Sequence, residues 1–166
     1  MSLLLYYIYA LELQYDFDLQ SQIKNRSAFE KEMLHHESRK SITFFVFDLN
    51  NLKKINDLYG HGEGDKLIVA AAKILNTQFA SIGDVFRIGG DEFCAMSIAL
   101  TDTQAKKVLQ ELSSTIESYN LSVSNKLELA QGYAHYDHQS DVSIYTALSK
   151  ADDAMYAHKA ILKSSL

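Results

Sequence analysis

The sequence contains no proline, one cysteine and only seven glycines among its 166 residues. A disulfide scaffold needs paired cysteines, so the single thiol excludes that class and favours a reducing compartment. Collagen-like and low-complexity chains need far more glycine, proline or charge than this sequence has. With 47% hydrophobic and 22% charged residues, the chain instead has ample material for the core of one globular domain.

The sequence also has no excess of positive charge. It contains 16 Lys and Arg residues and 21 Asp and Glu residues, which gives a formal net charge of −5. This balance argues against nucleic acid as a partner and implies that any phosphate ligand is bound locally. The longest apolar run, residues 3–11, is shorter than the roughly 20 residues that cross a bilayer, and it lacks the features of a signal peptide. We therefore expect a cytoplasmic protein, or the cytoplasmic part of a membrane-anchored sensor.

Residues 1–17 form a segment distinct from the rest, since positions 3–13 are unusually apolar and aromatic. Two interpretations stay open. The segment either packs on the domain as an N-terminal helix, or it is a connector that descends from an upstream sensor or membrane segment. Its first residues are also consistent with a cloning remnant. Residues 18–166 are then expected to form a single domain.

Hydrophobic patterning predicts alternating helices and strands. Ser27 and Glu30 form a capping-box pattern, which predicts a helix from about there toward residue 36. Its inward-facing residues should be Phe29, Met33 and Leu34. The apolar run 42–49, interrupted abruptly by Asp48, is typical of a central strand buried on both faces.

Two short strand-like runs, 84–88 and 92–96, flank Gly89, Gly90 and Asp91 and predict a tight hairpin with Asp91 at its tip. The other expected elements are helices near 52–59, 67–75, 101–116 and 144–158, a glycine-rich turn at 60–64 and a strand at 127–134. This order predicts an α/β sandwich of the α+β kind, in which helices cover a mainly antiparallel central sheet.

Asp48 and Asp91 are the two acidic residues that the pattern isolates at chain reversals. If the hairpin pairs beside strand 42–49, the two carboxylates converge, and they repel each other unless a cation neutralises them. Mg²⁺ suits such a site because it takes hard oxygen ligands and keeps positions for water and phosphate, with Mn²⁺ as the alternative ion. Ordinary turn chemistry explains either aspartate taken alone.

Several longer motifs add to this observation. They are Arg87-Ile88-Gly89-Gly90-Asp91-Glu92-Phe93, the segment 48–61, Gly64-Asp65, Asn25-Arg26 and the segment 151–159. In this order and at these intervals they resemble the GGDEF family of diguanylate cyclases over roughly residues 18–163. The resemblance implies a nucleotidyl-cyclase or palm-like fold with a GGDEF β-hairpin.

The same resemblance implies a nucleotidyl transfer in which two GTP molecules form cyclic di-GMP and release two pyrophosphates. Each domain of such an enzyme holds one GTP, so the active site is completed by an antiparallel homodimer. The resemblance also implies an upstream sensory domain or a phosphodiesterase domain as partner in a longer protein. The rival interpretation is a catalytically silent GTP-binding regulatory module.

By resemblance, the metal ligands are Asp48, Asp91 and the main-chain carbonyl of Leu49, and Asp91 also matches the proton acceptor. Asn56 and Asp65 match the pair that reads guanine, whose edge offers one acceptor and two N–H groups to an amide and a carboxylate. The positions expected to bind the triphosphate are Gly89, Gly90, Asn51, Leu52, Lys53, Lys159 and Lys163.

Lys53 is expected to stabilise charge during catalysis, although a lysine alone is more often a solvated surface charge. Glu92 is assigned an orienting role, on the side of the strand opposite Asp91 and away from the metal. Arg87 is expected to pair with a carboxylate near the site or, alternatively, in an ordinary cross-strand ion pair.

The sequence departs from the family at four places. Asn50 replaces a second acidic residue beside the metal, and residues 19–24 replace the family's Leu-Thr-Gly-Leu segment. Residues 162–164 replace Gly-Arg-Asn, so Lys163 keeps the charge without the arginine fork. Residues 80–83 lack the Arg-x-x-Asp of a product-inhibition site, which predicts no tight feedback by cyclic di-GMP through that surface.

Overall fold

The computed structural model describes residues 2–3, 15–36, 41–137, 139–140 and 143–164. Most of the apolar segment that we interpret as an N-terminal helix or connector, residues 4–14, lies outside this range. The elements, in chain order, are β1 (Lys24–Asn25), α2 (Arg26–His36), β2 (Ile42–Leu49), α3 (Leu52–Tyr59), α4 (His61–Phe79), β3 (Gly83–Arg87), β4 (Glu92–Ile98), α5 (Asp102–Asn120), β5 (Leu129–Tyr136) and α6 (Ile144–Ser164).

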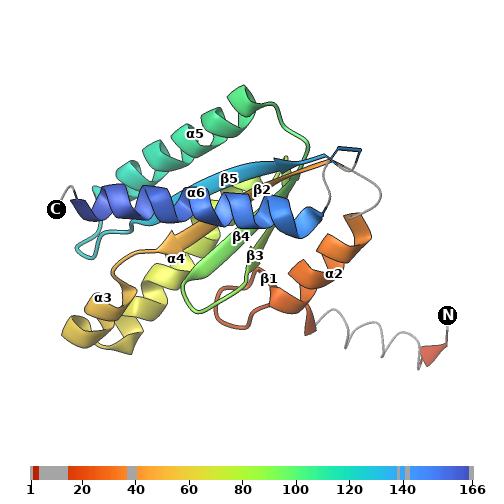
Figure 1. Cartoon of the computed structure of the whole chain (residues 1–166). Coiled ribbons are helices and arrows are strands. Elements are labelled where there is room, and N and C mark those ends of the chain that lie inside the picture. The colour runs from red at the N-terminus through yellow and green to blue at the C-terminus, as the bar shows by residue number, and fades with distance from the viewer. Residues whose placement is uncertain (1, 4–14, 37–40, 138, 141–142, 165–166) are drawn as a thin grey trace.

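The strands form one sheet in the order β1-β3-β4-β2-β5, with β2 between two long neighbours (Figure 1). Every pairing is antiparallel except that of β1 with β3. All eight residues of β2 are buried, because both of its edges are paired and both of its faces are covered. The predicted central strand is therefore confirmed.

Helices α4 and α5 cover one face of the sheet, and α2 and α6 cover the other (Figure 1). Side chains of β2 alternate between these layers. Phe45 and Phe47 pack edge-on against Phe79 of α4, with ring centroids 5.0 and 6.0 Å apart. Phe44 and Val46 join the core under α2 and α6. The predicted α+β sandwich is confirmed, and the even-numbered side of β2 faces α6.

Gly132 allows α6 to lie directly on β5. A Cβ at this position would come 2.2 Å from the backbone N of Met155 and 2.3 Å from the carbonyl O of Ala151. No side chain fits at such distances, so the close approach requires glycine. The contact fixes the path of α6 across the sheet, and its last turns therefore reach the end of β2.

The start of α2 differs from the expectation. The side chain of Asn25 accepts a hydrogen bond from the backbone N–H of Ala28 at 3.0 Å, so Asn25 rather than Ser27 caps the helix. Phe29 and Met33 are buried as predicted, whereas Leu34 is 64% exposed. The prediction for Leu34 was wrong because a helix lying on a sheet buries only one narrow stripe.

Two boundaries also shift. Helix α4 begins at His61, so Gly60, with a φ of 84°, makes the turn between α3 and α4, and Gly62 and Gly64 are already helical. Strand β5 begins two residues later than expected. The capping box at Thr101 and Gln104 is confirmed at the start of α5. Among the described helices, none combines the length and apolar composition of a membrane-spanning segment.

Candidate active site

The end of β2 and the tip of the β3–β4 hairpin meet at one corner of the sheet. The β2–β4 register pairs Asp48 with Glu92. One step further, the backbone N–H of Leu49 donates to the carbonyl O of Asp91 at 2.8 Å. The hairpin tip is therefore held against the end of β2, as the convergence of Asp48 and Asp91 requires.

Asp48 is a nearly buried carboxylate, with 5% of the residue exposed. Lys159 of α6 places Nζ 2.6 Å from Asp48 Oδ1, and its own side chain is 22% exposed. A buried carboxylate needs such a counter-ion, because burial without one costs several kcal/mol per charge, about the scale of a whole domain's stability. Asp152 lies on the same helix, and burial together with Asp153 and Asp48 raises its pKa.

A pocket of about 590 Å³ opens beside this corner. Its lining residues are Leu49, Asn50, Asn51, Leu52, Lys53, Lys54, Asp57, Leu58, Asp91, Glu128, Lys159 and Lys163. Four of them are lysines and three are acidic, so the pocket offers ammonium groups to an anion and carboxylates to a cation. The sequence patterns did not single out Lys54, Asp57 or Glu128, whose place in the lining depends on the fold.

The loop that leads into α3 lines part of the pocket. Asn51 has a φ of 62° and makes no side-chain cap, and α3 begins at Leu52. The first N–H groups of a helix have no partner within the helix, and they carry its positive dipole end. The role expected for Asn51 and Leu52 would use these backbone groups to bind phosphate oxygens.

Asn50 ties the end of β2 to the start of β5. Its side-chain nitrogen donates to Glu128 Oε1 at 2.6 Å, and its backbone N–H donates to the Glu128 carbonyl O at 2.9 Å. Asn50 Oδ1 is buried and has no hydrogen-bond partner among the described residues. The position where the family carries an acid is thus a neutral bridge with one free acceptor.

Asn56 and Asp65, the pair expected to read guanine, lie on the packed helices α3 and α4. A Cβ at Gly64 would come 1.9 Å from Asn56 Oδ1, so glycine allows this approach. Asn56 Oδ1 is buried without a partner in the described part of the chain. Asp65 is exposed, and its carboxylate accepts a hydrogen bond from Gln20. Neither residue lines the lysine-rich pocket. A base bound by this pair would therefore lie outside that pocket, against α3 and α4.

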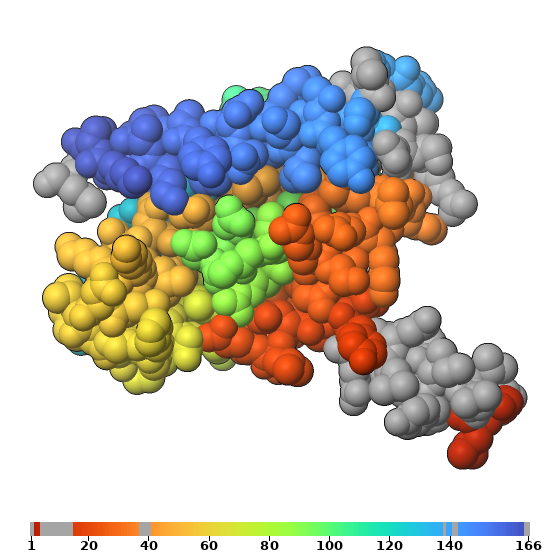
Figure 2. All heavy atoms as spheres, turned by 60° about the horizontal axis from the view of Figure 1, so that its bottom comes forward, coloured from red at the N-terminus to blue at the C-terminus, as the bar shows by residue number. Residues whose placement is uncertain are grey.

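Arg87 organises the tip of the hairpin. Its side chain donates to the carbonyl oxygens of Gly89 at 3.2 Å and Gly90 at 2.8 Å, and it pairs with Asp18 at 2.8 Å. Arg87 therefore pairs with a carboxylate beside the hairpin tip, as one of the two expectations had it, and not with a cross-strand residue. Figure 2 shows the β3–β4 segment (green) at the surface between α3 and α4 (yellow), α6 (blue) and the orange-red N-terminal part.

Asp18 is held as an anion by its neighbours. Burial alone would raise its pKa, but hydrogen bonds from the hydroxyl and the backbone N–H of Ser21, together with Arg87, outweigh burial and lower the pKa. Asp18 therefore remains a charged partner for Arg87 throughout the neutral range.

Glu92 lies differently from the expectation. The register places it directly opposite Asp48, so the two Cβ atoms share one face of the sheet. Its carboxylate lies against Gly89, because a Cβ at Gly89 would come 2.4 Å from Glu92 Oε2. Glu92 was expected opposite Asp91 and away from the metal, but Asp91 lies in the turn, where strand alternation does not apply, and the register places Glu92 on the face that carries Asp48.

The oxygen donors expected at this corner are of the kind that a magnesium or manganese ion prefers. Asp48, Asp91 and the Leu49 carbonyl offer hard oxygens, and the ammonium of Lys159 shows that Asp48 accepts a cation. The described residues contain no cluster of three or more His, Cys, Asp or Glu that alone suits a metal. Water and phosphate oxygens would therefore have to complete the coordination, as is usual for Mg²⁺.

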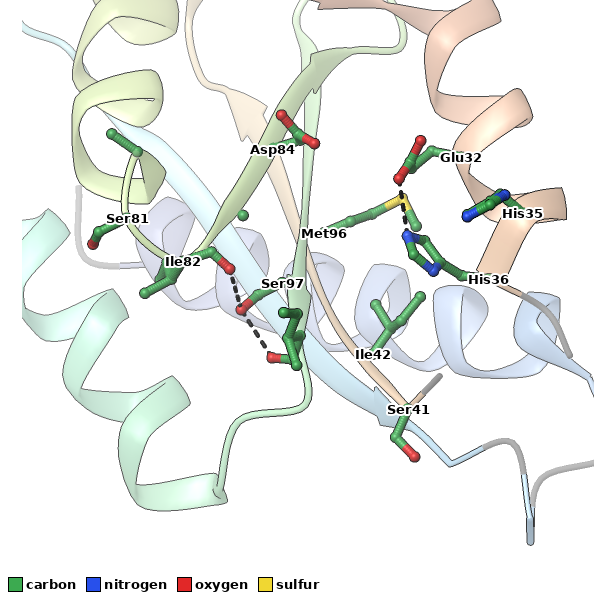
Figure 3. Close-up of a pocket in the computed structure, with 13 residues that line it drawn as sticks. Glu32, His35, His36, Ser41, Ile42, Ser81, Ile82, Asp84, Met96 and Ser97 are labelled. Carbon is green, nitrogen blue, oxygen red and sulfur yellow. Dashed lines mark hydrogen bonds and ion pairs between the residues drawn. The ribbon is translucent and has the colours of Figure 1, made fainter. Parts of the chain in front are cut away.

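A second pocket, of about 490 Å³, lies at the opposite end of β2 (Figure 3). It is lined in part by residues 80–83, where the family's product-inhibition motif would stand. Glu32 and His36 form a hydrogen-bonded pair on its wall, and Ser97 bonds to the Ile82 carbonyl O. None of the described lining residues is Lys or Arg, so this pocket offers no such cation for a phosphate.

The family model "Diguanylate cyclase, GGDEF domain" matches residues 15–164. The chain therefore belongs to the GGDEF diguanylate cyclase family, whose members as a class synthesise cyclic di-GMP. It is 30% identical over 129 residues to diguanylate cyclase DgcM of Escherichia coli, covering 77% of this chain and 31% of that protein. It is 31% identical over 138 residues to the signaling protein YkoW of Bacillus subtilis, and the match covers 78% of this chain and 16% of that protein.

A solved structure supports the fold. The coiled coil and GGDEF domain of DgcB from Caulobacter crescentus, crystallised with c-di-GMP, superposes with a TM-score of 0.82 at 23% identity. The match covers 94% of this chain and 86% of that one. The two curated relatives are much longer, since the chain spans less than a third of either.

Proposed function

We propose that this domain is an active diguanylate cyclase that condenses two GTP molecules into cyclic di-GMP. The observation that carries the proposal is the meeting of the Asp48 and Asp91 positions beside a lysine-lined pocket, within a chain of this family. The pocket supplies what a triphosphate needs, namely ammonium groups and free helix N–H groups.

In this proposal Lys53, Lys159 and Lys163 bind the triphosphate, while Asn51 and Leu52 donate backbone N–H groups to it. A magnesium or manganese ion, when bound by Asp48, Asp91 and the Leu49 carbonyl, offsets the negative charge of the phosphate oxygens. The backbone of Gly89 and Gly90 lies close to the phosphates, and Arg87 holds its two carbonyl groups in place.

The bond changes are those of an in-line displacement at phosphorus. The ribose 3′-oxygen of one GTP bonds to the α-phosphorus of the other, and the bond to the pyrophosphate oxygen breaks. Asp91 accepts the hydroxyl proton, and its carboxylate has no ion-pair partner among the described residues that would compete for this role. Glu92, packed over Gly89, orients the tip of the hairpin.

Lys159 has two roles in this proposal. Without nucleotide it neutralises Asp48. A divalent ion bound with GTP would supply this neutralisation at Asp48 instead, and Lys159 would then be free to contact the phosphates. The exchange keeps Asp48 paired with a cation throughout, which avoids leaving a buried charge unpaired.

One domain contains half of the reaction site, so we propose an antiparallel homodimer, transient in the isolated domain. In a longer cytoplasmic protein, an upstream sensory domain or a phosphodiesterase domain would control this pairing. The length of the curated relatives supports additional domains.

A silent GTP-binding module is the second candidate, and Asn50 favours it because the site lacks one negative charge next to Asp48. The test incubates the purified domain with GTP and Mg²⁺ and measures cyclic di-GMP. We expect product from the wild type and from Glu117→Ala, an exposed carboxylate on α5, and none from Asp91→Ala. Tight GTP binding without product in the wild type would establish the silent module instead.

A further inference from the structure

Gln20 uses both ends of its side-chain amide. Its Nε2 donates to Asp65 Oδ1 at 2.6 Å, and its Oε1 accepts from Arg87 Nη1 at 2.6 Å. The three residues come from the N-terminal loop, α4 and β3, at sequence separations of 45 and 67 residues. One neutral side chain therefore connects two charged groups of opposite sign.

Each end of this connection leads to a different part of the proposed site. Asp65 belongs to the pair expected to read guanine. Arg87, whose side chain is only 11% exposed, donates to the Gly89 and Gly90 carbonyls at the hairpin tip. The network thus joins the position of the base to the position of the triphosphate.

The loop that carries Gln20 is itself fixed. Asp18 accepts from the backbone N–H and the hydroxyl of Ser21, and its carbonyl accepts from the Gln22 N–H at 2.9 Å. Gln22 has a φ of 60°, and the N–H of Asp18 donates to the Ile23 carbonyl at 2.8 Å. A side chain presented from such a closed turn loses little freedom when it forms hydrogen bonds.

We propose that Gln20 is a positioning residue that sets the orientation of Asp65 for guanine binding. This inference rests on the proposed function. Asp65 is exposed on α4, and a free carboxylate there would rotate among several rotamers. The bond from Gln20 uses one lone pair of Oδ1, so both carboxylate oxygens keep a lone pair to accept the N1–H and the N2–H of the base.

A neutral amide is well suited to this task. It orients the Asp65 carboxylate without neutralising it, so the charge stays available to the base, whereas a lysine would compete with the nucleotide. Because Gln20 also accepts a hydrogen bond from Arg87, the same side chain fixes the position of the hairpin tip relative to Asp65. We therefore expect Gln20 to influence the choice of base more than the stability of the fold.

The test uses two substitutions with different effects on the network. Gln20→Met removes both hydrogen bonds at similar volume, and Gln20→Glu keeps an acceptor for Arg87 but removes the donor to Asp65. The matched control is Gln110→Met on the exposed side of α5. Calorimetric titration with non-hydrolysable analogues of GTP and of inosine triphosphate, both with Mg²⁺, gives the dissociation constants.

We expect both Gln20 variants to bind the GTP analogue about fivefold to tenfold more weakly than wild type, the scale of one typical hydrogen bond. The loss should be smaller for the inosine analogue, which lacks the 2-amino group. Melting temperatures should match the control. Unchanged GTP affinity in both variants, or equal losses for the two nucleotides, would overturn the role of Gln20 while the proposed function stands. Failure of the wild type to bind GTP would overturn both.

Discussion

Lys159 Nζ lies 2.6 Å from Asp48 Oδ1, where α6 crosses the end of β2. This ion pair places a cation on the carboxylate that the metal-binding hypothesis requires. A divalent ion bound by Asp48, as proposed, would have to compete with this ammonium for the carboxylate.

Lys159→Met should lower the free energy of unfolding by about 3 kcal/mol, because Asp48 is then buried without a counter-ion. Mg²⁺ should restore more stability to this variant than to wild type, since the ion finds Asp48 unoccupied. Urea denaturation with and without Mg²⁺ measures both effects, and Lys150→Met, an exposed position on the same helix, is the control. An identical response to Mg²⁺ in variant and wild type would show that Asp48 does not bind the ion.

Gly132→Ala should destabilise the domain by about 3 kcal/mol, because the new Cβ collides with the backbone of α6. Gly62→Ala is a control of the same chemistry, since a Cβ there meets nothing within 4 Å. That change should be neutral or stabilising, by up to about 1 kcal/mol in a helix. Chemical denaturation of the two variants separates the effect of a steric collision from the effect of replacing any glycine by alanine. Equal denaturation midpoints for the two variants would refute the packing argument.

The Asp18 pair predicts a defined pH dependence. The pKa of Asp18 is lowered in the folded state, so its contribution to stability is complete above the ordinary aspartate value of about 3.9 and is lost as the pH falls through the lowered folded value. Asp18→Asn should therefore be less stable than wild type at pH 7, and the difference should shrink below about pH 4. Urea midpoints across this range measure it, and a difference independent of pH would contradict the assignment.

Cyclic di-GMP should not bind tightly at the second pocket. The described residues lining that pocket offer Glu32, Asp84 and histidines but no Lys or Arg, so a product with two phosphates finds no strong cationic partner there. Calorimetric titration of the domain with cyclic di-GMP should give no tight binding beyond the active site. A higher stoichiometry would show that this surface still carries feedback.

The local sequence pattern predicted the features whose causes are local. A continuous apolar run is typical of a buried central strand, and two glycines before an aspartate are typical of a tight turn, so Asp48 and Asp91 were both placed correctly on their elements. The β2–β4 register and the bond from the Leu49 N–H to the Asp91 carbonyl bring their backbone positions together, and the convergence of their carboxylates stays a prediction.

Contacts between distant segments were not predictable in this way. Gln20 meets Asp65 and Arg87 only because the N-terminal loop closes on the hairpin, and neither contact leaves a periodic signal in the sequence. Glu128 reaches Asn50 through the pairing of β5 with β2, which patterning did not specify. Leu34 and Glu92 were misplaced because helix burial and turn geometry depend on neighbours that only the fold supplies.

The most direct test of the account measures cyclic di-GMP formation from GTP and Mg²⁺ across a series of protein concentrations. Because the proposed mechanism places one half of the reaction site on each of two domains, the rate should rise faster than linearly with concentration, and Asp48→Asn and Asp91→Ala should each abolish it. A rate strictly proportional to concentration, or product formation that survives either substitution, would contradict the shared aspartate-centred site.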